Sequence, residues 1–167
     1  MKRTLTLISV LTLLLTACEG PQGPPGFDGF DGQDGVNFVG QSFEVGPLNF
    51  TSSNGYENTV DFPENVFIGE DDMLLAYLLW DENPDTWRLL PQTIYTSTGE
   101  FQYNFQDNFD NVSIFLDAPA SFDFSTLLPG DTENQFFRIV ILPIDLINSE
   151  NINVNDFNSV MNYVELN

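Results

Sequence analysis

The sequence predicts an all-β domain over residues 36–167, an antiparallel β-sandwich of seven or eight strands. Short runs of alternating apolar and polar residues recur in this part of the chain, separated by clusters of Gly, Pro, Asn, Asp and Ser. That pattern is typical of half-buried strands joined by turns. The chain also contains 16 Phe, five Tyr and two Trp, so we expect a packed core rather than disorder.

The first strands are predicted between Phe43 and Phe62. Alternation runs from Phe43 through Leu48 to Phe50, and the chain returns through residues 59–62. Ser53-Asn54-Gly55 lies between the two runs and is a strong turn signal. We therefore expect one β-hairpin here.

Residues 73–80 are eight apolar residues in a row, which predicts a strand covered on both faces. Asn83-Pro84 then marks a turn, and the apolar residues that follow, from Trp87 to Tyr95, predict the return strand of a second hairpin.

The clearest alternation follows Thr98-Gly99, where three aromatic residues alternate with three amides. One face of this strand is predicted to be core and the other solvent-exposed: Phe101, Tyr103 and Phe105 against Gln102, Asn104 and Gln106. Residues 112–116 and 136–142 complete the predicted strands, and Pro143 ends the last one because it has no N–H to donate. Residues 155–164 predict one short helix with its apolar face formed by Phe157, Val160, Met161 and Val164.

Residues 1–17 have the organisation of a secretory signal peptide. Lys2 and Arg3 precede an apolar stretch over residues 5–15, and small residues end the segment. A stable transmembrane helix needs about 20 apolar residues, so this stretch is too short to be a permanent span.

Leu15-Thr16-Ala17-Cys18 resembles the lipobox of bacterial lipoproteins. The resemblance implies that the chain is cut before Cys18, that its thiol is diacylated and that the new amine is acylated. Cys18 is the only cysteine, so it cannot form a disulfide within the chain. We expect Cys18 to hold the protein in a lipid bilayer. Glu19 is not the aspartate associated with inner-membrane retention, which favours the outer membrane and leaves its periplasmic and surface faces as alternatives.

Glycine occupies every third position from Gly20 to Gly35, the period of collagen. Only two of the triplets contain proline, and the last three end in aspartate without a lysine nearby. Two interpretations remain open for residues 18–35: an extended spacer that reaches about 50 Å, or a triple-helical stalk that makes the protein a homotrimer.

The charge of the mature chain excludes nucleic acid as a partner. All 25 acidic residues follow Cys18, where Arg88 and Arg138 are the only cations, so the mature formal charge is −23. Nucleic-acid binding needs basic patches that neutralise phosphates, and an anionic membrane surface would repel this domain. We expect each arginine to pair with a carboxylate.

The sequence contains no histidine, and acylation of Cys18 would leave no free thiol. These absences exclude Ser-His-Asp and Cys-His catalysis and zinc sites built from His or Cys within the chain. We therefore predict no catalytic residue, no cofactor and no metal. A carboxylate-based hydrolase is the alternative, since it needs only two suitably spaced acids.

Three oxygen-rich segments are candidate calcium loops: residues 70–72, 81–85 and 153–156. None has the spacing of an EF-hand, and Asp and Asn are ordinary turn residues. We interpret them as turns.

Trp80 and Trp87 flank the turn at residues 81–86, and with Tyr95 they are the candidate aromatic platform for sugar rings. The competing interpretation is core packing, because the tryptophans adjoin apolar strand residues. Exposure of these side chains distinguishes the two.

The combined features resemble a family of short collagen-like lipoproteins of the Bacteroidota type. The likeness covers most of the chain: residues 18–26, then 90–93, 99–105 and 135–139. It implies a lipidated β-rich protein and no particular activity. The function we predict is a membrane-anchored, noncatalytic lipoprotein that displays a β-sandwich in envelope structure, adhesion or ligand capture; the alternative is a carbohydrate-binding module with exposed aromatics.

Overall fold

The computed structural model describes residues 39–166. The predicted signal peptide (residues 1–17) and the predicted lipidated cysteine and spacer (residues 18–35) lie outside this range. Strands make up 49% of the described residues and form two sheets, one of them curled into a half-barrel, which confirms the all-β prediction. The described residues contain nine strands, whereas the sequence predicts seven or eight.

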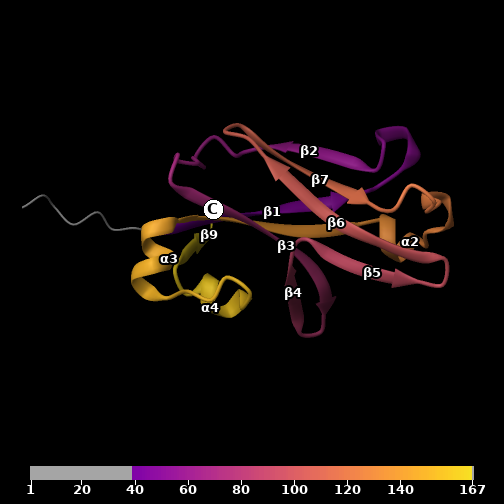
Figure 1. Cartoon of the computed structure of the whole chain (residues 1–167). Helices are drawn as coiled ribbons and strands as arrows, with labels where there is room; N and C mark the ends of the chain where they lie inside the picture. The colour runs from indigo at the N-terminus through magenta and orange to yellow at the C-terminus, as the bar shows by residue number, and fades with distance from the viewer. Residues whose placement is uncertain (1–38, 167) are drawn as a thin grey trace, which may run out of the picture. The chain divides into compact units, whose positions relative to one another are not determined.

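The first sheet has the strand order β4-β3-β8-β1-β9 (Figure 1). Its strands are β4 (Asp85–Leu89), β3 (Asp72–Glu82), β8 (Gln135–Pro143), β1 (Gly40–Leu48) and β9 (Val164–Leu166). Neighbouring strands are antiparallel except β1 and β9, which are parallel. The prediction of an antiparallel arrangement is thus wrong for this one edge pair, because the chain returns to β1 through a helical segment.

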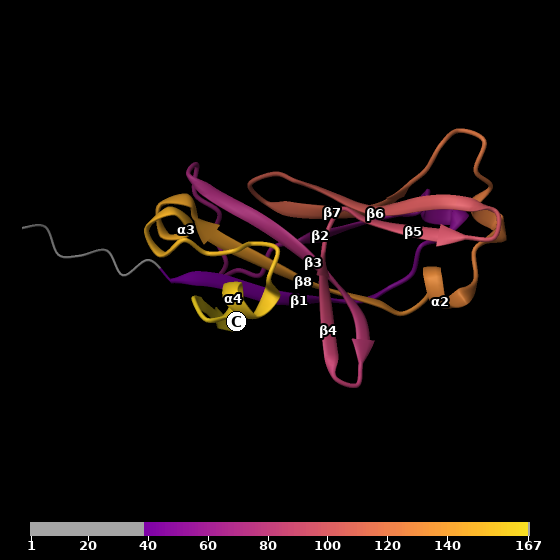
Figure 2. The same cartoon turned by 60° about the horizontal axis from the view of Figure 1, so that its bottom comes forward.

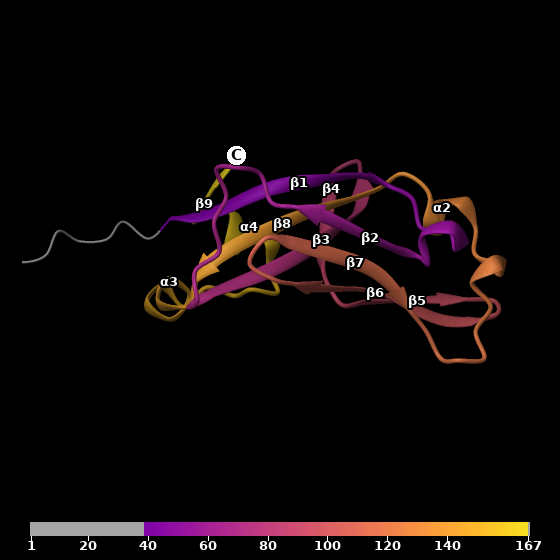
Figure 3. The same ribbon diagram turned by 90° about the horizontal axis from the view of Figure 1, so that it is seen from above.

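The second sheet has the order β2-β7-β6-β5 and is antiparallel throughout. It consists of β2 (Glu57–Asp61), β7 (Asn111–Asp117), β6 (Gly99–Asp107) and β5 (Gln92–Thr96). Figure 3 shows β5, β6 and β7 in one layer, with β1 and β8 in the other.

Side chains from both sheets meet in the main hydrophobic core. Alternation places every second residue of each strand on this face. Phe101 and Tyr103 of β6 are buried here, as the alternation predicts. The other members drawn from the strands include Leu74, Ala76, Leu78, Val112, Ile114, Phe137, Ile139 and Ile141.

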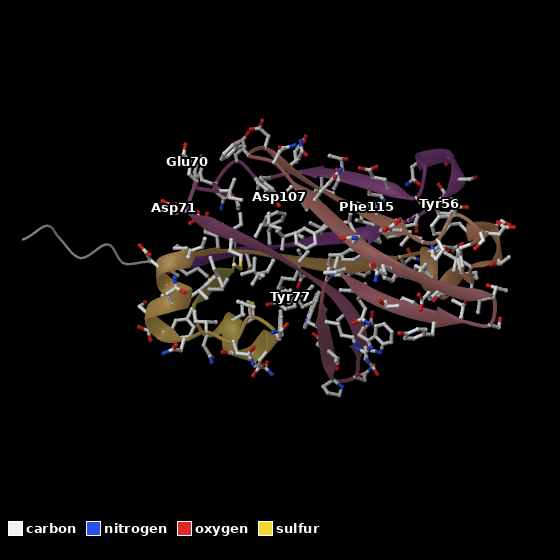
Figure 4. The ribbon with its side chains drawn as sticks, viewed as in Figure 1. Tyr56, Glu70, Asp71, Tyr77, Asp107 and Phe115 are labelled. Carbon is white, nitrogen blue, oxygen red and sulfur yellow. The ribbon has the colours of Figure 1, made fainter. Side chains whose placement is uncertain are left out.

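A second, smaller core lies on the opposite face of the first sheet. Leu75 and Tyr77 of β3 point into it, and α3 (Ile144–Glu150) and α4 (Phe157–Met161) contribute Leu146 and Val160. In Figure 4, Tyr77 lies in the interior, whereas Glu70 and Asp71 lie at the surface near the start of β3. Because cores lie on both faces of β3, its residues 74–78 are all buried, which confirms the prediction from the apolar run for these five residues. The prediction is wrong at the two ends of the run, since Met73 and Trp80 are exposed.

The predicted hairpin between Phe43 and Phe62 is wrong, because β1 and β2 belong to different sheets. β1 pairs with β8 and β9, and β2 pairs with β7. The turn signal does form a tight bend, with Gly55 at φ 66° after the 3-10 helix η1 (Ser52–Asn54). Phe50 is 1% exposed in the main core, so the chain crosses from one sheet to the other here instead of doubling back.

The second predicted hairpin is present as β3 and β4, and it projects from the body of the domain (Figure 2). The return strand ends at Leu89, however, and the chain then enters β5 of the other sheet.

The C-terminal segment differs from its prediction. Helix α4 spans only Phe157–Met161, and Val164 begins β9 instead of completing the helix. The 3-10 helix η2 (Phe124–Thr126) and the short helix α2 (Pro129–Thr132) complete the described elements, and none of the helices within residues 39–166 is long and apolar enough to cross a membrane.

Candidate binding cleft at Trp80

Trp80 occupies a β-bulge near the end of β3. Leu79 pairs with Trp87 and Asp81 pairs with Thr86, so Trp80 is an extra residue with no partner on β4. A bulge of this kind changes the direction of a side chain and is common next to binding sites. Trp80 is 43% exposed, although the buried residues 74–78 of β3 end only two positions before it.

The side chain of Trp80 lines a cleft of about 410 Å³. An adjacent hollow of about 200 Å³ shares several of its residues and reaches Tyr103 in the second sheet. The two hollows are lined at one end by the β3–β4 hairpin and at the other by α2 and the start of β8. The polar lining residues of the larger cleft are Asp81, Glu82, Asn83, Asn134 and Gln135.

Hydrogen bonds fix the wall of the cleft that faces Trp80. The Tyr103 hydroxyl donates to the carbonyl oxygen of Asp131. Burial, and secondarily the negative charge of Asp131, raises the pKa of Tyr103 well above its usual range, so its hydroxyl stays protonated. Gln135 Nε2 donates to the carbonyl oxygens of Gly130 at 2.9 Å and of Glu133 at 2.8 Å. These hydrogen bonds join β6, α2 and the start of β8 at this wall.

Arg88 lies over the indole of Trp80, with its Cζ 3.6 Å from the ring centroid. Among the described residues no carboxylate lies within 4.0 Å of the Arg88 guanidinium. The prediction that Arg88 pairs with a carboxylate is therefore wrong for residues 39–166. A cation on an exposed aromatic ring stabilises the pair by about 0.5–1 kcal/mol. Arg88 thus positions the indole and occupies one of its faces.

Trp87 and Tyr95 do not join Trp80 in one platform. Trp87 lies on the other face of the hairpin, where it stacks on Phe157 at 5.5 Å with an interplanar angle of 22°. Tyr95 is 79% exposed on β5, and its strand neighbour Ile94 packs against the main core. Adjacent residues of a strand point to opposite faces, which separates these side chains. Trp87 therefore packs in the second core, as the core-packing interpretation predicts, whereas Trp80 and Tyr95 are exposed.

Arg138 forms an ion pair with Glu44, as the sequence predicts for it. Its guanidinium also lies 4.8 Å from the Trp87 ring centroid and 5.7 Å from that of Phe157. Burial lowers the pKa of Arg138, which nonetheless remains a cation at physiological pH. This residue joins the first sheet to α4 and does not line the cleft.

The three oxygen-rich segments use their side chains to fix turns. Asp72 accepts from the Gly69 amide at 2.7 Å, Asp81 from the Asn83 amide at 3.1 Å, and Asp156 from the Asn158 amide at 3.1 Å. Within residues 39–166 no three His, Cys, Asp or Glu side chains converge into a group that could hold a metal. The turn interpretation accounts for all three segments.

Glu100 and Asp117 border a separate hollow of about 280 Å³ on the second sheet. Both side chains are exposed. A glycosidase acid normally owes its raised pKa to an apolar, desolvated environment. An open sheet surface does not provide that environment.

No protein family, curated protein or solved structure matches this chain.

Proposed function

We propose that this protein is an outer-membrane lipoprotein, anchored through Cys18, that displays a noncatalytic β-sandwich and captures a ligand in the Trp80 cleft. The observation that carries the proposal is the cleft itself: a bulged, half-exposed tryptophan beside amide and carboxylate groups. The anchor is supported by the lipobox-like residues that end at Cys18.

The course of the strands supports display away from the anchored end. The chain enters the described domain at the start of β1 and runs along nine residues, about 30 Å at 3.3 Å per residue. β3 runs antiparallel to β8 and ends at the cleft. The chain reaches α2 after β7 (Figure 1). The cleft therefore lies in the half of the domain away from the start of β1.

A noncatalytic role is supported by the residues that line the cleft. They include no histidine, and no lining side chain is a thiol. The single tyrosine, Tyr103, is protonated and bound to the Asp131 carbonyl, so it is not available as a base. Binding is the chemistry that these groups support.

Membrane fractionation tests the anchor. The full chain, expressed in a bacterium that processes lipoproteins and fed a palmitate analogue, is expected in the outer-membrane fraction with the label attached. The Cys18→Ser variant is expected to lose the label and to remain unprocessed. Equal labelling of both proteins would contradict the proposal.

Protease treatment of intact cells then distinguishes the two faces of the outer membrane, since only a surface-displayed domain is cut.

A panel of glycan and ester substrates tests the noncatalytic role. Hydrolysis that disappears when a single cleft carboxylate, Asp81, Glu82 or Asp131, is changed to the amide would overturn it.

A further inference from the structure

We infer that the Trp80 cleft binds a neutral saccharide, an inference that rests on the proposed function of this cleft in ligand capture. Three properties of the cleft select this ligand class: the aromatic surface, the polar groups around it and the charge of the domain.

Trp80 is 43% exposed and lines the cleft, and the indole face that Arg88 does not cover supplies its flat apolar surface. Tryptophan combines a large apolar body with an N–H donor, so it suits partners that are apolar on one face and polar at the edge. A pyranose ring has this character, with C–H groups on its face and hydroxyls around its rim.

The side chains beside Trp80 match hydroxyl groups. Asn83, Asn134 and Gln135 carry amides, and an amide can donate to one hydroxyl and accept from another. Gln135 uses its NH₂ group on backbone carbonyls, which directs its carbonyl oxygen to accept. Asp81 and Glu82 add carboxylate acceptors that are exposed at the mouth of the cleft.

Charge counts against anionic and cationic ligands. The domain over residues 36–167 has 21 acidic residues and two arginines, a formal charge of −19, so it repels anionic polymers. A cationic ligand would normally bind over an exposed indole flanked by carboxylates. Arg88 lies on one face of Trp80, 3.6 Å from the ring centroid, and its charge opposes a second cation at this ring.

Affinity electrophoresis of the detergent-solubilised, lipidated full chain tests this inference. The gels contain dextran, laminarin, mannan or xylan as neutral polymers, alginate or polygalacturonate as anionic ones, and chitosan as the cationic one. Retardation is expected in at least one neutral gel and in neither anionic gel. Chitosan attracts a chain of formal charge −23 regardless of the cleft, so its gel serves only as a control for charge-driven retardation. Absence of retardation in every neutral gel, or retardation in an anionic gel, would overturn the inference.

Variants locate the binding. Trp80→Ala is expected to weaken retention at least about tenfold, the loss typical of a central aromatic contact, and Trp80→Tyr to restore most of it. Tyr95→Ala is the matched control, because it removes an exposed aromatic outside the cleft and should change nothing. Equal retention of Trp80→Ala and the parent protein would also overturn the inference.

A second variant avoids dependence on the fold of Trp80→Ala. A Cβ added at Gly130 meets no atom within 4 Å, so Gly130→Tyr is expected to fold and to obstruct the cleft.

Trp87→Phe leaves Trp80 as the only tryptophan, and the emission of Trp80 is expected to shift to shorter wavelength on saccharide binding. Saccharide binding can fail while palmitate labelling at Cys18 succeeds, which separates this inference from the proposed anchor.

Discussion

Asp107 and Asp123 show how one side chain acquires opposite properties in two environments. Burial is the larger influence on Asp107 and raises its pKa, although a backbone hydrogen bond partly offsets it. Asp123 caps η2 and accepts from the Ser125 amide at 2.9 Å, and its hydrogen bonds to Ser125 lower its pKa. In Figure 4, Asp107 lies near the end of the domain that carries Glu70 and Asp71.

These directions predict opposite effects of removing the charge. The raised pKa of Asp107 means that its contribution to stability is present at low pH and is lost as pH rises through the folded-state pKa. The lowered pKa of Asp123 means that its contribution is present at neutral pH and is lost as pH falls through its folded-state pKa. At pH 7, Asp107→Asn is expected to raise the melting temperature and Asp123→Asn to lower it. Thermal melts at pH 7 and pH 3 check this, and equal shifts of the same sign at pH 7 would contradict it.

Tyr77 provides a second test at the scale of one residue. Its side chain is fully buried, and its hydroxyl donates to the Val154 carbonyl at 2.7 Å. Tyr77→Phe leaves that carbonyl without this donor, at a cost of about 1 kcal/mol in the free energy of unfolding. Urea denaturation measures the change, with the exposed Tyr95→Phe as the control that should shift stability by less than about 0.5 kcal/mol. An unchanged free energy of unfolding in Tyr77→Phe would contradict a stabilising role for this hydrogen bond.

At the scale of elements, α4 depends for its stability on side-chain packing against the first sheet. A five-residue helix has little intrinsic stability. Val160 is 0% exposed in the second core, and Phe157 contacts both Tyr77 and Trp87. Loss of these contacts would therefore release the helix from β3 and β4.

Val160→Ala is expected to cost about 2 kcal/mol, because it removes two buried methyl groups and leaves a small cavity. Asn158→Ala on the exposed face of the same helix is the control and should change stability by less than about 0.5 kcal/mol. Equal effects of the two variants, measured by denaturation, would contradict the packing described here.

Sequence patterns predicted those elements whose signal is local. The eight-residue apolar run predicted the doubly covered β3, and the alternation at Phe101 and Tyr103 predicted the faces of β6. Partner strands could not be read in this way, since β1 pairs with β8 at a separation of about 100 residues, for example Gln41 with Ile141. The bulge that exposes Trp80 was missed for the same reason: it is a property of the pairing between β3 and β4.

At the scale of the whole molecule, charge governs how the mature chains meet. Each carries a formal charge of −23, and the last three Gly-x-Asp triplets would place like charges together in a triple helix. We therefore expect residues 18–167, produced without the predicted signal peptide and with Cys18→Ser, to sediment as a monomer at 0.15 M salt, where charge repulsion persists within about 8 Å. A trimer in that experiment would favour the stalk.

Mass spectrometry of the full chain recovered from membranes tests the anchored display most directly. The account predicts a mature protein that begins at Cys18 and carries three acyl chains, with residues 19–167 otherwise unmodified. A protein that keeps residues 1–17, or one that begins elsewhere with an unmodified Cys18 thiol, would contradict it.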